Sequence, residues 1–321
     1  MRIWHTLKTK NIRFIFQLVI TLGVIITFIY FIYNNSDKYL ELLNISQSGV
    51  LLLFLLSLAF PFLNGIQNTY LFRGVGVKGF THRDGYLITA ASTLANQLPI
   101  PGGIVSRGYY LKYRHNLSYA KYASSTIALF FCYLAINGMI GILVLLYWSL
   151  IDKNPIPPIL FLAFTAMVLC ILVFRLPLER IKMTEKLHQW IQQAVDGWTA
   201  IGQSPSLLFK LAILQAVLVV LLSIRYWIAF HMLSQNISLG QSLLFASASI
   251  LTQLVSIAPG GLGVREAIVA AVASVLGFDA SVSIVAVGID RLVVTIMIVF
   301  TGWISMIILG KQISAFPNES A

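Results

Sequence analysis

The chain has 321 residues, of which 58% are hydrophobic and only 10% are charged, and its formal net charge is +11. Soluble globular domains carry roughly 25% charged residues, so this composition excludes a soluble protein and indicates an integral membrane protein. The positive charge is not taken as a sign of nucleic-acid binding, because Lys and Arg residues in a membrane protein first report its orientation.

Long apolar runs are the main feature of the chain. The first, 14 to 33, follows a basic start and is too long for a secretion signal, so we interpret it as an uncleaved span. Further spans are expected at 49 to 72, about 120 to 149, about 156 to 176, about 207 to 233 and 280 to 309. Each can cross a hydrocarbon core of about 30 Å as a helix. Because the runs are solidly apolar rather than alternating, the sequence predicts an all-α, polytopic membrane helix bundle with about six full crossings.

Two apolar stretches, 86 to about 114 and 239 to 278, are interrupted by residues that break helices. The break residues are Pro101, Gly102 and Gly103 in the first stretch and Pro259, Gly260 and Gly261 in the second. We predict that each stretch is a re-entrant hairpin of two half-helices, the second half starting just after the glycines. The alternative is an ordinary span that is kinked by proline and glycine.

The two interrupted stretches resemble each other and have matching neighbours. Each lies between two full spans, and an arginine follows the second glycine by four residues, at Arg107 and at Arg265. The sequence therefore predicts one integral membrane domain, 1–321, that contains an inverted repeat of span, hairpin and span. Repeat 1 covers about 49–149 and repeat 2 about 206–310. The intervening segment, about 156–205, holds a linker helix and then either an interfacial helix on the cytoplasmic leaflet or a loop helix that docks on the bundle.

Basic residues predict the orientation of the chain. Placing the N-terminus in the cytoplasm puts most of the 22 Lys and Arg residues in cytoplasmic segments. We therefore expect both termini to be cytoplasmic and the two hairpins to enter from opposite faces. The expected location is a bacterial or archaeal cytoplasmic (inner) membrane.

Arg107 and Arg265 are the first candidate binding residues. Both lie in or near the first turn of the second half-helix of a hairpin, where backbone amides face the membrane centre and attract anions. A guanidinium at such a place can bind a phosphate through two hydrogen bonds. The expected ligand is a membrane lipid with an anionic headgroup.

Charged residues inside apolar surroundings form the second candidate group. Glu266 and Asp290 are the acidic residues that fall well inside apolar segments, and each neighbours an arginine, Arg265 or Arg291. Adjacent residues on a helix do not face each other, so we expect Arg265 or Glu266 to pair with Asp290 or Arg291 across helices. The cluster could bind a headgroup, with a carboxylate that takes up a proton, or it could be a structural ion pair. Arg225 lies near the outer end of its span and is expected to snorkel toward water.

Polar side chains of the first repeat have two interpretations. They could line the same cavity, or they could join helices by hydrogen bonds. These residues are Asn64, Gln67, Asn68, Asn96 and Asn137. The sequence contains no nucleotide-binding loop, zinc motif, nucleophile elbow or nucleic-acid module, so we expect no cofactor, no metal, no nucleic acid and no enzymatic activity.

A family resemblance rests on the same motifs. The segment 256–266 reads SIAPGGLGVRE, Asp290 and Arg291 follow in the next helix, and the first break precedes Arg107. These features resemble the flippase-like membrane domain of lysylphosphatidylglycerol synthases and the free-standing proteins built from that domain alone. The resemblance implies a role in lipid translocation or in a pathway that handles lipid-linked molecules. The soluble synthase domain has no counterpart in these 321 residues, so we expect no synthase activity.

These patterns together favour a lipid translocator that moves an anionic or modified lipid, or a lipid-linked intermediate, between leaflets. Arg107 and Arg265 would hold the phosphate, and Glu266, Asp290 and Arg291 would adjust the charge of the site. One alternative is a non-transporting membrane subunit that recruits a lipid- or glycan-synthesis enzyme. Another is a small-anion channel or exchanger. The sequence leaves open whether the protein forms oligomers.

Overall fold

The computed structural model describes residues 46–97, 102–151, 153–175, 202–253 and 263–314, together with residues 189, 192, 199 and 261. This part of the chain is helical and contains no strand, as the apolar runs predict. The expected first span and nearly all of the expected interfacial helix lie outside the described residues. So do the break residues Pro101, Pro259 and Gly260.

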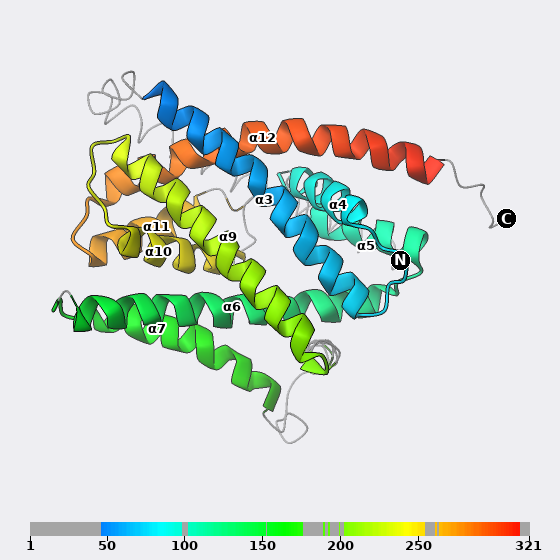
Figure 1. The fold of residues 1–321 in the computed structure, drawn as a ribbon, viewed down its shortest axis with the longest axis horizontal. Coiled ribbons are helices and arrows are strands. Elements are labelled where there is room, and N and C mark those ends of the chain that lie inside the picture. The colour runs from blue at the N-terminus through cyan, green and yellow to red at the C-terminus, as the bar shows by residue number, and fades with distance from the viewer. Residues whose placement is uncertain are drawn as a thin grey trace, which may run out of the picture.

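Four long helices carry most of the apolar surface. Each is long and apolar enough to cross a membrane, which confirms the spans that hydropathy predicts to within a few residues. They are α3 (Gln47–Gly74), α6 (Tyr119–Leu150), α9 (Pro205–His231) and α12 (Ala280–Ser314). Figure 1 shows α3 and α9 running side by side diagonally through the centre of the molecule, and the two helices pack against each other.

Serine residues determine where three of these helices begin. The hydroxyls of Ser46, Ser118 and Ser204 each accept a hydrogen bond from the backbone N–H three residues later. Such a cap satisfies one of the four N–H groups that have no partner within the helix.

Two pairs of short helices occupy the interrupted stretches. The first pair is α4 (His82–Ala95) and α5 (Gly102–His115). The second is α10 (Leu239–Ala248), continued by the 3₁₀ turn η4 (Ser249–Gln253), and α11 (Val264–Val275). Both α4 and α10 begin with a capping box, Thr81 with Asp84 and Ser238 with Gln241. In Figure 1 the two pairs lie toward opposite ends of the long axis.

The start of α5 differs from the prediction. We expected the helix to begin after the glycines, but Gly102 and Gly103 are its first two residues. The Gly103 N–H donates to the side-chain oxygen of Asn96 at 3.0 Å, and a Cβ at Gly103 would collide with the Ser92 carbonyl oxygen. The glycines therefore let the first turn of α5 lie directly against the end of α4. In the second pair α11 begins after Gly263, as predicted.

The segment between α6 and α9 contains α7 (Pro158–Leu169), which continues as the 3₁₀ turn η2 (Cys170–Arg175). It packs against α6, where Gly138 and Gly141 lie so close to Phe164 that larger side chains would collide with it. This confirms a linker helix near the predicted 156 to 176. It is shorter than the four candidate spans.

Packing between the two halves of the chain is crosswise: the short helices of each half pack against a long helix of the other half. Helix α4 packs on α3 of its own half and on α12 of the other half, whereas α10 packs on α9 of its own half and on α6 of the other. Helices α3 and α9 contact each other between them. Each short-helix pair is thereby held by the last span of the opposite half, and the charged side chains of α9, α11 and α12 are brought into one region.

Candidate functional site

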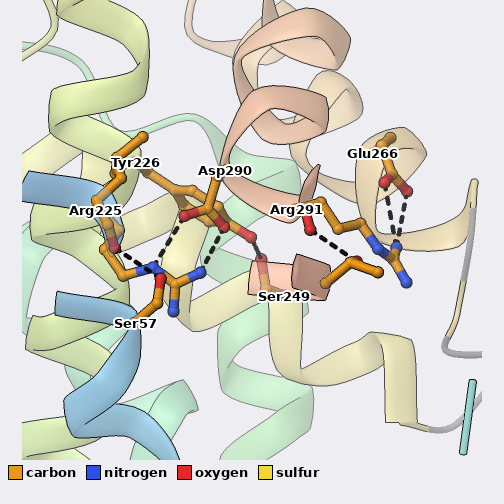
Figure 2. A network of polar contacts seen from close by, with 9 residues as sticks. Ser57, Arg225, Tyr226, Ser249, Glu266, Asp290 and Arg291 are labelled. Carbon is orange, nitrogen blue, oxygen red and sulfur yellow. Dashed lines mark hydrogen bonds and ion pairs between the residues drawn. The ribbon is translucent and has the colours of Figure 1, made fainter. Parts of the chain in front are cut away.

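A buried ion pair joins two of the long helices. Arg225 on α9 donates from Nε and Nη2 to the two carboxylate oxygens of Asp290 on α12, both at 2.8 Å. The side chains are only 2% and 1% exposed, and Figure 2 shows them facing each other between the helices. The guanidinium also lies over the ring of Phe60 on α3, 5.7 Å from its centre. Two parallel charge-assisted hydrogen bonds make this the most directional contact among the three spans.

Two predictions about these residues are corrected by this pair. Arg225 does not snorkel to the outer end of its helix, and Asp290 pairs with Arg225 rather than with Arg265. The physical reason is depth: a carboxylate on α12 lies level with Arg225, so the guanidinium gains more from pairing than from reaching toward water. Nearby, the Tyr226 and Ser249 hydroxyls form a 3.0 Å hydrogen bond that attaches η4 to α9.

A second ion pair connects α12 with the start of α11. Arg291 donates from Nη1 to both carboxylate oxygens of Glu266, at 3.1 and 3.2 Å, and to the carbonyl oxygen of Gly261 at 2.8 Å. Figure 2 shows Arg291 and Glu266 beside the first pair. The predicted pairing across helices is thus confirmed for Glu266 with Arg291. The hydrogen bond from Arg291 to the Gly261 carbonyl oxygen also holds one residue of the helix break in place.

Arg265 has no acidic partner in the described part of the chain. Its Nε is buried and without a hydrogen-bond partner there. Its neighbour in the chain, Glu266, pairs with Arg291, so Arg265 belongs to the same region. The guanidinium groups of Arg225, Arg265 and Arg291 outnumber the carboxylates of Glu266 and Asp290 by one. This region therefore carries one positive charge that neither carboxylate balances.

The helix that carries Arg265 also begins without a side-chain cap. Its N-cap is Gly263, with φ of 80°, which supplies no side chain to the N–H groups of the first turn. Those groups are the positive end of the helix dipole. Thr252, only 6% exposed, packs against Gly261 at this end, and its hydroxyl is buried without a partner among the described residues. A bound anion would satisfy both the charge and the unpaired donors.

Arg107 lies in a separate polar cluster in the first half. It donates from Nη2 to the Ser92 hydroxyl at 2.7 Å and from Nη1 to the side-chain oxygen of Asn68 at 3.4 Å. Asn68 in turn donates to the Thr89 hydroxyl at 2.8 Å. Every one of these partners is uncharged. Arg107, like Arg265, is a half-buried arginine with no carboxylate partner within the described ranges.

A buried region with a net positive charge at a helix break is uncommon among membrane proteins, so similarity to a known family helps to interpret it. The family model for the lysylphosphatidylglycerol synthase TM region matches residues 14–302. The chain belongs to this family. No curated protein and no solved structure matches it significantly.

Membership in the lysylphosphatidylglycerol synthase TM region family confirms the resemblance seen in the sequence, and the match contains both arginine clusters. Together with the four apolar helices it establishes an integral membrane protein of a lipid-related family. Within the described residues of this family member, no group of His, Cys, Asp and Glu side chains could hold a metal ion.

The remaining polar residues do not all follow the two expected roles. Asn64 and Asn137 donate to carbonyl oxygens of their own helices. Gln67 donates from α3 to the Leu211 carbonyl oxygen and to Gln215 on α9, both at 3.4 Å, which is the predicted bonding between helices. Among the described residues, no hydrogen bond or ion pair joins the Arg107 cluster to the Arg265 region. That both arginines hold one ligand stays a prediction.

Proposed function

We propose that this protein moves a lipid with an anionic headgroup, or a lipid-linked intermediate, from one leaflet to the other. The observation that carries the proposal is Arg265: a guanidinium without a carboxylate partner, in the first turn of an uncapped helix, inside an apolar bundle. A half-buried charge with an unpaired, buried donor inside an apolar bundle is costly, and a headgroup phosphate supplies the missing negative charge.

The depth of the site in the bilayer supports the same proposal. At a rise of 1.5 Å per residue, Arg291 lies about 16 Å from the start of α12. This is close to half of the roughly 30 Å hydrocarbon core. Arg265, whose neighbour Glu266 pairs with Arg291, is then near the middle of the bilayer. A headgroup that pauses at this depth has a polar partner, while its acyl chains stay in the membrane.

The proposed topology is the inverted repeat, with both termini cytoplasmic and the α4–α5 and α10–α11 pairs entering from opposite faces. Three features support it: the order span, short pair and span occurs twice, each pair begins with a capping box, and the packing between halves is crosswise. Matched broken helices at a repeat interface are typical of transporters that alternate access around a central site. Arg107 would then be the corresponding contact on the opposite side.

Leaflet exchange of fluorescent phospholipids in liposomes tests the proposal. The comparison is wild type against Arg265→Gln and Arg107→Gln, with the exposed Arg83→Gln as a matched control. Loss of a hydrogen bond to a charged group costs about 1.5–3 kcal/mol, so exchange should slow by about tenfold or more in the two site variants. Arg83→Gln should exchange at the wild-type rate. Folded wild-type protein that exchanges none of several headgroups would refute the proposal.

The second candidate function is recruitment of a lipid- or glycan-synthesis enzyme. It is favoured by a group of exposed basic side chains on α4, on α5 and on the segments that flank them. These are Arg73, Lys78, Arg83, Lys112 and Lys121. An acidic partner surface would be attracted to them. In that case, neutralising these residues would abolish function, whereas Arg265→Gln would not.

A further inference from the structure

An apolar groove separates the second short-helix pair from the last span of the first half. It has a volume of about 360 Å³ and lies between α6 and α10. Its lining residues are Ile140, Leu143, Val144, Tyr147, Gly240 and Leu243. The volume falls within the roughly 300–1,000 Å³ that is usual for small-molecule sites. Apart from the tyrosine hydroxyl, the lining side chains offer no polar atom.

The corresponding seam in the other half is closed. There α4 packs against α12, and a Cβ added to Gly302 would lie 2.5 Å from the Leu94 Cβ and 3.0 Å from the Ala90 carbonyl oxygen. In the α6–α10 seam, a Cβ added to Gly240 would meet Val144 at an ordinary 3.6 Å. Crosswise packing makes these two seams counterparts, and among the described residues the α6–α10 seam holds the groove whereas the α4–α12 seam is closely packed at Gly302.

The position of the groove determines what can fill it. Helix α6 is a candidate membrane span, and Leu143 and Tyr147 on it are 65% and 61% exposed. The groove is therefore continuous with the surface of α6 that contacts hydrocarbon. Water is excluded as its occupant, because a bound water needs two to four polar partners. No side chain of the described residues fills the groove, and hydrocarbon of the bilayer matches its apolar lining.

We propose that the α6–α10 groove binds one acyl chain of a membrane lipid, and that this seam is the lateral opening through which a lipid keeps its tail in the bilayer while its headgroup lies at Arg265. The inference rests on the proposed function. From Leu243, the α10–η4 segment runs to Thr252 beside the start of α11, about 14 Å away at 1.5 Å per residue. That distance is close to half of the ~30 Å hydrocarbon core, which is the depth that one acyl chain covers.

Photo-crosslinking in lipid nanodiscs tests this binding. The probe is phosphatidylglycerol with a photoreactive diazirine in one acyl chain, and mass spectrometry locates the crosslinked peptides. The filling variant is Gly240→Leu, since the space around Gly240 admits a side chain without collision with backbone. The control is Gly310→Leu, where an added Cβ meets nothing within 4 Å. Both variants place a leucine on a membrane helix, but only the first one occupies the groove.

In wild type we expect crosslinks at Leu143, Tyr147 and Leu243. Gly240→Leu should lower their yield about tenfold, which corresponds to roughly 1.4 kcal/mol of binding free energy. Gly310→Leu should leave the yield unchanged. Equal crosslinking in Gly240→Leu would overturn the inference, and so would the absence of lipid crosslinks at these three residues in wild type. If the groove crosslinks as expected but wild type exchanges no lipid in liposomes, acyl-chain binding stands and the proposed translocation fails.

Discussion

Removal of one partner from the Arg225–Asp290 pair should destabilise the fold far more than removal of both. Asp290→Asn keeps the size and shape of the side chain but leaves the guanidinium of Arg225 without a counter-charge. Both residues are almost completely buried, and the two 2.8 Å hydrogen bonds are the ones that satisfy Arg225. Breaking a buried pair in this way costs about 3–5 kcal/mol, because a charge stays buried and unpaired.

The double variant Arg225→Leu with Asp290→Leu serves as the matched control. Replacement of a whole buried ion pair by apolar side chains is usually neutral or stabilising by about 1–4 kcal/mol. The surrounding bundle is apolar, since Arg225 also lies against the ring of Phe60. We therefore expect the double variant to be at least as stable as wild type, although it lacks the strongest contact between α9 and α12.

The assay is unfolding of the purified protein in mixed detergent micelles, followed by circular dichroism as the fraction of SDS increases. Asp290→Asn should shift the midpoint to a lower SDS fraction, and the double variant should restore it. A result in which the double variant is as unstable as Asp290→Asn would refute the reasoning. It would mean that the pair itself, rather than the unpaired charge, determines stability.

Two further predictions concern stability. Gly302→Leu should cost about 1–3 kcal/mol by overpacking the α4–α12 seam, measured by the same unfolding assay, and an unchanged midpoint would contradict the close packing with Leu94. The free energy of unfolding should also depend on pH. Burial raises the pKa of Asp84, but hydrogen bonds from Thr81 and Tyr110 outweigh burial and hold this pKa below its ordinary 3.8. The stabilisation is therefore present above pH 3.8 and is lost as pH falls through the lowered pKa. Tyr110→Phe should weaken this loss in a pH series of unfolding curves, and an unaltered pH profile would contradict it.

Hydropathy predicted the long helices well because a membrane span needs only length and apolar composition. The helix breaks were predictable for a similar reason: proline and glycine interrupt helices through their own backbone chemistry. The sequence did not show that Gly102 and Gly103 belong to α5, since that depends on how closely α5 approaches Ser92 and Asn96 of the neighbouring α4 segment.

The pairing of the charged residues was predicted only in part. Pairing of Glu266 with Arg291 could be anticipated because few charges lie inside apolar segments and adjacent ones cannot face each other. The partner of Asp290 was missed because Arg225, near the end of its span, had a simpler explanation in snorkelling. A count of the charges was the available signal, since three arginines and two carboxylates leave one positive charge without a carboxylate of its own.

Thr252 could not be recognised from the sequence, because a threonine in an apolar stretch is ordinary. Its importance depends on where its unpaired hydroxyl lies, next to Gly261 and the start of α11. The difference between the α6–α10 seam and the α4–α12 seam could not be predicted from the sequence either. Gly240 and Gly302 are both single glycines in helices, and only the distances to their neighbours distinguish open packing from closed packing.

Leaflet exchange by Arg265→Gln tests the central claim most directly. In liposomes that contain equal amounts of folded protein, the account predicts that Arg265→Gln slows exchange about tenfold or more relative to wild type, as expected for a lost hydrogen bond to a charged group. Its unfolding midpoint should stay near that of wild type, because Arg265 has no partner to lose among the described residues. Wild-type exchange by a folded Arg265→Gln protein would contradict the account.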